Sequence, residues 1–497
     1  MQKILLQSTK MSNRTHKPFI GKFILDTLSV GMYNHPLMLV REYIQNSADA
    51  IDEICNKGLL KKKDAKIEMI IDGKERKLII SDNGIGVKSE NIWNTLFDLG
   101  NSTKNIISNR GFRGIGRLGG LGYCDKLISK TKYKNEKYYS ECIWDCIKLK
   151  QLITEKNSLD ITEIIEQVTT LKKTISNDYE DHYFVVEMHN VKSVRDVLLD
   201  VPAIKAYVSQ VAPVPFNSNM FSFADLIDTE LRNSIPKYET YNISINGEKI
   251  FKPYKDDVVI SDKNNDRISN ITFIKLENTS PLAYGWIGEL VLLGAIKSVN
   301  NIDGLRIRHG NILIGDKNLL SDFYRERRFN SYLIGEIHTL DHKLIPNSRR
   351  DDFEDNSFKE EFYNCFIKEI GLPYSRKIRE ASEVRSRTNK ELLENNIFEI
   401  AKKIINHGYI SEVQKKKIIE EIKQVKEKNK NSNNEDVNDV ISSLTSSKHI
   451  LDCLSKRLSP PKKSLLKSIF DVIYKMSTNK KEAEKIINKI LNISIEQ

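Results

Sequence analysis

The stretch Arg41-Glu42-Tyr43-Ile44-Gln45-Asn46-Ser47-Ala48-Asp49-Ala50-Ile51-Asp52 organises this chain. Apolar residues recur in and before it at intervals of three and four, which predicts a helix with one apolar face. Glu42, Asn46 and Asp49 follow the same spacing, so they share one side of that helix. Two carboxylates and an amide on one side suit a divalent cation with a water molecule or a phosphate oxygen beside it. Taken alone, the spacing also fits an ordinary solvated helix face.

Two glycine motifs follow this helix in the chain. Asp82, Gly84 and Gly86 form an Asp-x-Gly-x-Gly turn after two strand-like runs, residues 66–71 and 77–80. Such a turn lets the backbone approach a flat ligand while one carboxylate points at that ligand. Residues 110–122 then contain six glycines, whose bare N–H groups can cradle phosphates. Either motif on its own is also explained by a simple turn.

The three stretches, in this order and at these gaps, resemble the nucleotide-binding boxes of the GHKL ATPases. This Bergerat-fold superfamily includes gyrase, HtpG-type chaperones, histidine kinases and MutL. The likeness is greatest to the HtpG-type heat-shock chaperones, in which a helix like residues 19–30 leads into an Arg-Glu-x-x-x-Asn-x-x-Asp-Ala box. It covers about the first 355 residues.

The resemblance implies an α+β chain of three parts. Residues 1–225 are expected to form a Bergerat-fold α/β sandwich that binds ATP, and residues 226–355 an α/β middle domain of the transducer type. Residues 356–497 are rich in Lys and Glu and are expected to be helical, with a role in dimerisation or partner docking.

The resemblance also assigns roles to the first two motifs. Glu42 is expected to hold and deprotonate the attacking water, and Asn46 to coordinate Mg²⁺. Asp49 would orient the side chains of Glu42 and Asn46 without contacting the nucleotide itself. Asp82 would accept a hydrogen bond from the adenine amino group, and the glycines after it, Gly84 and Gly86, would let the backbone approach the base.

The phosphates are expected to lie against the glycine-rich segment. Its N–H donors would come from four glycines, Gly111, Gly114, Gly116 and Gly119. Arg113 or Lys104 would add positive charge, and Lys104 falls in residues 89–109, which resemble the ATP lid of the family.

An arginine from the middle domain is expected to reach the γ-phosphate. Residues 346–351, Pro-Asn-Ser-Arg-Arg-Asp, are similar to the Leu-Pro-x-Asn-x-Ser-Arg-Glu loop of HtpG-type chaperones. Arg349 is preferred because it directly follows Ser348, but Arg350 stays open because an acidic residue follows it. The alternative is a charged helix N-terminus, where Asp351 and Asp352 would complement the helix dipole.

One departure from the family concerns the strand expected at residues 182–189. The family carries a Gly-Thr pair near adenine there, whereas this chain has Tyr183-Phe184-Val185-Val186. Either another residue supplies the hydroxyl group or the base is recognised more loosely.

Composition limits the class of protein further. The 497 residues are 39% hydrophobic and 29% charged, and no apolar run reaches the length of a membrane span. Residues 1–17 lack the features of a signal peptide, so a cytoplasmic protein with reduced cysteines is expected. The net charge of +11 would suit nucleic acid, but Lys and Asn are abundant throughout, which favours a basic surface without a binding role.

The expected function is a Mg²⁺-dependent ATP hydrolase, a homodimer that opens and closes on a protein client. The alternative is a DNA-linked GHKL ATPase of the mismatch-repair, topoisomerase or chromatin-compaction kind, including one that serves bacterial defence. A nucleic-acid partner is the less favoured reading, because the chain shows no topoisomerase tyrosine domain and no metal-nuclease motif.

Overall fold

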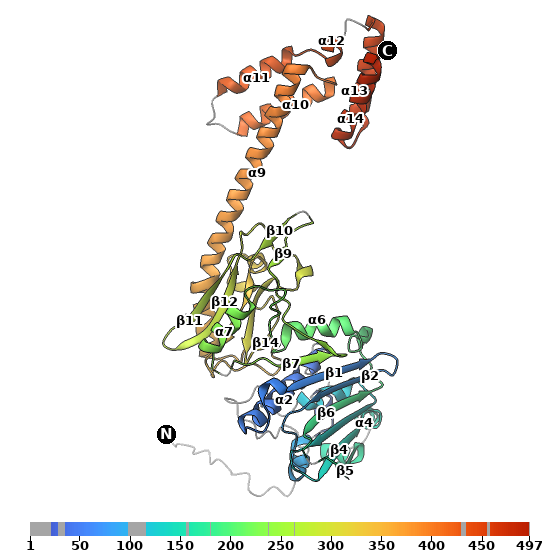
Figure 1. Ribbon diagram of the computed structural model, residues 1–497, viewed down its shortest axis with the longest axis vertical. Coiled ribbons are helices and arrows are strands. Elements are labelled where there is room, and N and C mark those ends of the chain that lie inside the picture. Colours follow the sequence, from blue (N-terminus) through green and yellow to red (C-terminus); the bar gives the residue numbers. More distant parts are fainter. Residues whose placement is uncertain are drawn as a thin grey trace, which may run out of the picture. The chain divides into compact units, whose positions relative to one another are not determined.

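The computed structural model divides the chain into two compact units, Met1–Arg379 and Glu380–Gln497, and helix α9 (Leu372–His407) crosses this division (Figure 1). It describes residues 21–27, 35–97, 116–155, 159–178, 180–236, 238–262, 264–428, 434–454 and 458–496. Within these ranges, no helix combines the length and the apolar content needed to cross a bilayer.

The first sheet of the first unit has eight strands in the order β5-β4-β3-β6-β2-β1-β7-β8. The strands are β1 (Lys66–Asp72), β2 (Lys77–Asp82), β3 (Lys126–Lys132), β4 (Tyr138–Asp145), β5 (Thr169–Ile175), β6 (Tyr183–His189), β7 (Asn242–Ile245) and β8 (Glu248–Lys249). In β1, buried and exposed residues alternate strictly, as expected for a sheet with one covered face.

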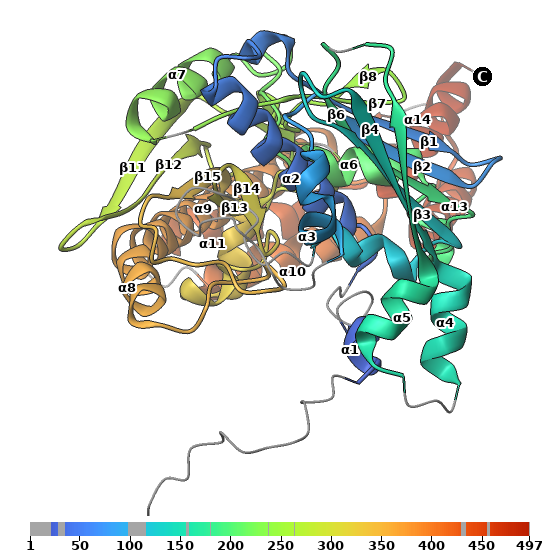
Figure 2. The same ribbon diagram turned by 90° about the horizontal axis from the view of Figure 1, so that it is seen from below.

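A layer of helices packs on the covered face, and one apolar core joins the two (Figures 1 and 2). The layer contains α2 (Met38–Asn56), α3 (Ile92–Leu96), α4 (Cys146–Thr154), α5 (Ile161–Val168) and α6 (Val201–Val211). Helix α2 forms because its apolar residues fall on one stripe, which includes the fully buried Leu39, Val40 and Ile51. It contacts β1, β2 and α6, so the organising stretch lies at the centre of the sandwich.

The second sheet has five strands in the order β11-β12-β15-β13-β14. They are β11 (Asn270–Glu277), β12 (Pro281–Glu289), β13 (Gly304–His309), β14 (Ile312–Ile314) and β15 (Ile334–Thr339), with a separate hairpin of β9 (Asp257–Val259) and β10 (Asn265–Arg267). Neighbours Trp286 and Ile287 belong to different cores, because successive strand residues point to opposite faces. Helix α7 (Ala224–Ser234) packs in one core and α8 (Ser357–Phe366) in the other.

The second unit is helical. After α9 it contains α10 (Glu412–Lys428), α11 (Asn434–Ser446), α12 (Ile450–Leu454), α13 (Pro460–Met476) and α14 (Lys480–Glu496). Two small cores hold it together, one around Ala401 and Ile422 and one around Phe470 and Ile487. The sequence pattern predicts a single helix over 461–493, but the structure has two, α13 and α14.

The expected fold class is confirmed: an α/β sandwich domain, an α/β middle region and a helical C-terminal region. Strand β4 is shorter than the strand over 138–148 that the sequence pattern predicts. It ends at Asp145 because this side chain accepts a hydrogen bond from the Lys148 amide and starts α4. Of the helix expected over 19–30, the described residues contain α1 (Phe23–Asp26).

Candidate functional site

The first and third motifs pack directly on each other. Gly116 begins the 3₁₀ helix η4 (Gly116–Gly122), and a Cβ atom added to it would lie 3.0 Å from Glu42 Oε2. Tyr43 Oη donates to the Arg117 carbonyl at 3.2 Å and accepts from the Gly120 amide at 3.1 Å. The described end of the glycine-rich segment, which includes Gly119, is therefore fixed beside the acidic side of α2.

Four residues expected at the phosphates lie outside the described residues: Lys104, Gly111, Arg113 and Gly114. On α2, Asp49 is 5% exposed, while Glu42 and Asn46 are half-buried. Glu42 and Asn46 thus keep accessible surface on the helix side that η4 borders, whereas Asp49, further along the same side, is buried.

The second motif packs on α2 through its glycines. Asp82 is buried at the end of β2 and accepts a hydrogen bond from the Gly84 amide at 2.9 Å. A Cβ atom on Gly84 would lie 2.6 Å from that of Ala50, and one on Gly86 would lie 2.1 Å from the Lys132 carbonyl. Both glycines are needed for the turn to fit against α2 and β3, and Gly86 also has a φ of +71°.

An ion pair joins the first motif to the middle region. Arg350 Nε lies 3.4 Å from Glu42 Oε1, and Arg41 Nε lies 3.6 Å from the same oxygen. Arg350 is 6% exposed, whereas Arg349 is exposed and contributes its carbonyl, which accepts from Arg41 Nη2 at 2.9 Å. The two neighbouring arginines therefore make different contacts. The side chain of Arg350 contacts Glu42, and the backbone carbonyl of Arg349 binds the side chain of Arg41.

The loop that carries Arg350 is fastened to the second sheet. The Gly315 amide donates to the Arg350 carbonyl at 2.8 Å, and Pro346 and Phe353 form a bridge at the base of the loop. Arg350 itself has a φ of 54°, a left-handed conformation that costs a non-glycine residue free energy. With this backbone conformation the side chain of Arg350 reaches Glu42.

Tyr207 of α6 also belongs to this neighbourhood, and sequence reasoning missed it. Burial raises the pKa of Tyr207, the positive charge of Arg41 lowers it, and the negative charge of Glu42 raises it. These two charges act on the hydroxyl because α6 packs against α2. No local motif marks Tyr207, so only the packing of the two helices identifies it.

A buried charged cluster, the Glu336 cluster, lies where α6 meets the second sheet. Its members are Lys252, Tyr254, Arg308, Glu336 and His338. Arg308 Nε donates to Glu336 at 2.6 Å, and Lys252 Nζ donates to both carboxylate oxygens at 2.9 and 2.7 Å. Tyr254 Oη donates to Glu336 at 3.1 Å, and His338 Nε2 lies 3.2 Å from it.

Arg308 also connects this cluster to α6. Its Nη2 donates to the Gln210 carbonyl at 2.8 Å, in the last turn of the helix. A cation near the carbonyl end of a helix is favourable because it complements the helix dipole. Helix α6 thus contacts α2 and is held at its last turn by Arg308 of β13.

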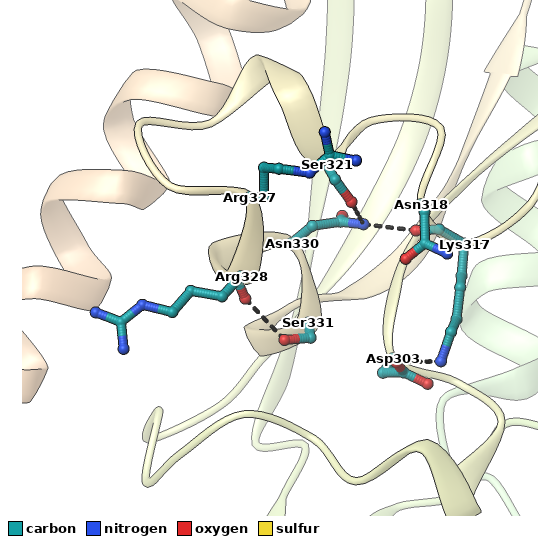
Figure 3. A pocket seen from close by; sticks show the side chains of 8 residues that line it. All are labelled: Asp303, Lys317, Asn318, Ser321, Arg327, Arg328, Asn330 and Ser331. Carbon is teal, nitrogen blue, oxygen red and sulfur yellow. Dashed lines mark hydrogen bonds and ion pairs between the residues drawn. The ribbon is translucent and has the colours of Figure 1, made fainter.

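A separate hollow of about 220 Å³ lies in the middle region. It is lined by Asp303, Lys317, Asn318, Ser321, Arg327, Arg328, Asn330 and Ser331 (Figure 3). Its charges are paired: Lys317 with Asp303, Arg327 with Asp322, and Arg328 with Glu326. None of the three motifs contributes a residue to it, so we do not assign the nucleotide to this hollow.

Comparison with known proteins identifies the class of the first domain. Residues 35–177 match a family model described as "Histidine kinase-, DNA gyrase B-, and HSP90-like ATPase". With the three motifs assembled on α2, β2 and η4, these residues form an ATPase domain of the GHKL superfamily.

Within that superfamily the chain is similar to bacterial HtpG chaperones. It is 38% identical to Chaperone protein HtpG of Alkaliphilus metalliredigens over 82 residues, 15% of this chain and 13% of the relative. For HtpG of Rickettsia canadensis the identity is 28% over 196 residues, which are 36% of this chain and 30% of the relative. For HtpG of Buchnera aphidicola the identity is 24% over 191 residues, which are 35% of this chain and 29% of the relative. The chain thus matches at most 30% of the length of these relatives.

Proposed function

We propose that this protein is a conformational ATPase that hydrolyses ATP and thereby opens and closes on a protein client, as a homodimer. The observation that carries the proposal is the contact between Glu42 and Arg350. It places a side chain of the middle region on the carboxylate expected to activate water. Hydrolysis and the position of the middle region would then depend on each other.

In this mechanism Glu42 orients the attacking water and accepts its proton. Asn46, one helical turn further on, would hold a Mg²⁺ ion, which supplies charge neutralisation at the phosphates when bound. The described residues contain no cluster of three or more His, Cys, Asp or Glu side chains that could hold a metal ion. A single amide ligand from Asn46 suits a cation whose remaining ligands are phosphate oxygens and water. Asp82 would accept from the adenine amino group.

We assign contact with the γ-phosphate to Arg350, not to Arg349. Arg350 is buried beside Glu42, whereas the side chain of Arg349 is exposed. In the structure Arg350 and Arg41 flank the Glu42 carboxylate, and both lie beside the same oxygen, Oε1. A γ-phosphate would compete for Arg350 and release Glu42 to act on water. ADP lacks that phosphate, so the contact would distinguish the two nucleotides.

Helix α13 supports the proposed dimer. It carries an exposed apolar stripe at intervals of four, three and four residues: Leu465, Ile469, Val472 and Met476, which are 63%, 37%, 54% and 80% exposed. This spacing is that of helices which pack side by side with a like helix. A second copy of α13 would cover it.

A DNA-linked ATPase is the second candidate, because the net charge is +11. An ATP turnover assay of the full chain separates the chaperone-like function from the DNA-linked one. Turnover is measured for the protein alone, with an unfolded protein client, and with double-stranded DNA. Stimulation by the unfolded client is expected. Stimulation by DNA alone would replace the chaperone-like function with the DNA-linked one, and no turnover under any condition would reject both.

A further inference from the structure

Strands β13 and β14 form a hairpin between α6 and the loop that carries Arg350. The two residues of its turn, Gly310 and Asn311, have φ values of 55° and 61°. Positive φ at both positions is typical of a type I′ turn, which fixes the register of the two strands. Ile307 and Ile314 pair across the hairpin, and both are buried in the core beneath the second sheet. A tight turn and buried packing make this hairpin a rigid element.

The first strand of the hairpin holds the last turn of α6. Arg306 is 3% exposed, and its Nε donates to Gln210 Oε1 at 3.1 Å. The amide nitrogen of Gln210 donates in turn to the Asn301 carbonyl, which also accepts from Arg306 Nη2 at 3.0 Å. Arg308, on the same strand, binds the backbone carbonyl of Gln210. Both the side chain and the backbone of Gln210 are thus bound to the middle region, which anchors the hairpin to α6.

The other end of the hairpin meets the loop of Arg350 at Gly315. The Gly315 amide donates to the Arg350 carbonyl, and its own φ of +64° is left-handed. A Cβ atom added to Gly315 would lie 2.8 Å from the Asp351 carbonyl oxygen, which is closer than side chains approach backbone atoms. Glycine therefore allows the end of β14 and the loop to lie this close together.

These contacts form a closed circuit that includes Glu42. Helix α6 contacts both α2 and β14. From β14 the circuit continues through Gly315 and Arg350 to Glu42, which lies on α2. The residue before Arg350 is also held, because the Arg349 carbonyl accepts from Arg41. Since α6 fixes one end of the hairpin and Gly315 binds the loop at the other, the hairpin sets the position of Arg350 relative to Glu42.

We propose that the β13–β14 hairpin is a positioning arm for Arg350 in ATP hydrolysis, with Gly315 as a positioning residue and Gln210 as its anchor on α6. This inference rests on the proposed role of Arg350 at the γ-phosphate. Gly315 and Gln210 act through Arg350 and not through contact with the nucleotide. A side chain at Gly315 displaces the loop, so Arg350 no longer meets the phosphate in the productive position. Misplacing a catalytic group by about 1 Å costs up to about 10²-fold in rate.

The test compares ATP turnover of the full chain in Gly315→Ala with that in the control Gly247→Ala. Gly247 also has a positive φ, +81°, but a Cβ atom there meets nothing within 4 Å. Both alanines carry the strain of a left-handed conformation, and only Gly315→Ala displaces the loop. Gly315→Ala should lose on the order of 10-fold to 100-fold in turnover and keep its ADP affinity within about 3-fold of wild type. Gly247→Ala should keep its turnover within about 3-fold of wild type.

A double variant separates positioning from a general effect on the fold. When Gly315→Ala is combined with Arg350→Ala, the arginine is absent, so turnover should stay within about 3-fold of Arg350→Ala alone. A further loss of about 10-fold in the double variant would show that Gly315 acts through the fold in general, and the inference would be overturned. Turnover of Gly315→Ala equal to that of Gly247→Ala, with Arg350→Ala impaired, would overturn this inference alone. Wild-type turnover in Arg350→Ala would instead reject the proposed role of Arg350 itself.

The variant Gln210→Met tests the other end of the hairpin and covers the case in which Gly315→Ala does not fold. It removes the hydrogen bond to Arg306 while filling similar volume, so turnover should fall on the order of 3-fold to 10-fold. The same change should have no effect on turnover when it is combined with Arg350→Ala. Wild-type turnover in Gln210→Met, or an equal fall in both backgrounds, would overturn the positioning arm.

Discussion

The substitution Glu336→Gln tests the charge balance of the Glu336 cluster. The cluster contains two cationic side chains, Lys252 and Arg308, and one carboxylate, and the pairs Lys252–Glu336 and Arg308–Glu336 are at most 1% exposed. Glutamine has nearly the same shape, so the change removes the negative charge with little change in packing. Lys252 can respond by losing its proton, because burial and the charge of Arg308 lower its pKa to about 7. Arg308 cannot do so and is left as an uncompensated buried cation.

Loss of one partner of a buried ion pair costs about 3–5 kcal/mol of the free energy of unfolding. For a unit of this size that corresponds to a fall of roughly 5–10 °C in melting temperature. Lys252→Met is the matched control. It leaves Arg308 paired one-to-one with Glu336 and fills similar volume, so we expect a loss below about 1.5 kcal/mol.

Tryptophan fluorescence is the assay for both variants. The chain has three tryptophans, Trp93, Trp144 and Trp286, all within the first unit. Trp286 is fully buried with its ring centroid 5.0 Å from that of Tyr254, so it reports directly on the surroundings of the cluster. A melting temperature of Glu336→Gln within about 2 °C of wild type, or an equal fall in Lys252→Met, would refute the charge-balance argument.

Four further predictions concern pH, catalysis and assembly. Lys252 ionises near pH 7 when folded and near its ordinary 10.5 when unfolded, so between these values the unfolded state binds more protons and stability rises with pH. The melting temperature should fall from pH 9 to pH 7, and less so in Lys252→Met. Glu42→Ala should bind ATP like wild type yet lose on the order of 10²-fold in turnover, and wild-type turnover would reject Glu42 as the base. Arg350→Ala should spare ADP affinity and cut turnover on the order of 10³-fold, whereas Arg349→Ala should keep its turnover; the reverse result would exchange their roles. Val472→Asp should shift a dimer to a monomer in sedimentation, and an unchanged sedimentation coefficient would exclude α13 as the interface.

The sequence by itself determined the elements that depend on local pattern. The apolar stripe of α2 follows from the helical period, and strands β1 and β2 follow from two alternating runs. Their connection spans residues 73–76, with a positive φ at Arg76, and is longer than the two-residue Asp-Gly turn that the sequence pattern predicts. The three nucleotide motifs are each continuous in the chain, so their order and spacing were sufficient to indicate a GHKL ATPase. The roles of Glu42, Asn46 and Asp82 towards a nucleotide remain predictions on that basis.

Only the tertiary structure decided which distant residues meet. Arg349 and Arg350 are alike in sequence, but the left-handed turn at Arg350 and the packing of the loop on β14 send one to Glu42 and the other to solvent. Phe184 lies beside Asp82 through the register of β6 on β2, where a slip of one residue would turn it to the opposite face. Strand β7 pairs in parallel with β1 across more than 150 intervening residues, and no local pattern specifies that partner. Such contacts depend on loop closure and on the burial of whole faces, which a short stretch of sequence does not encode.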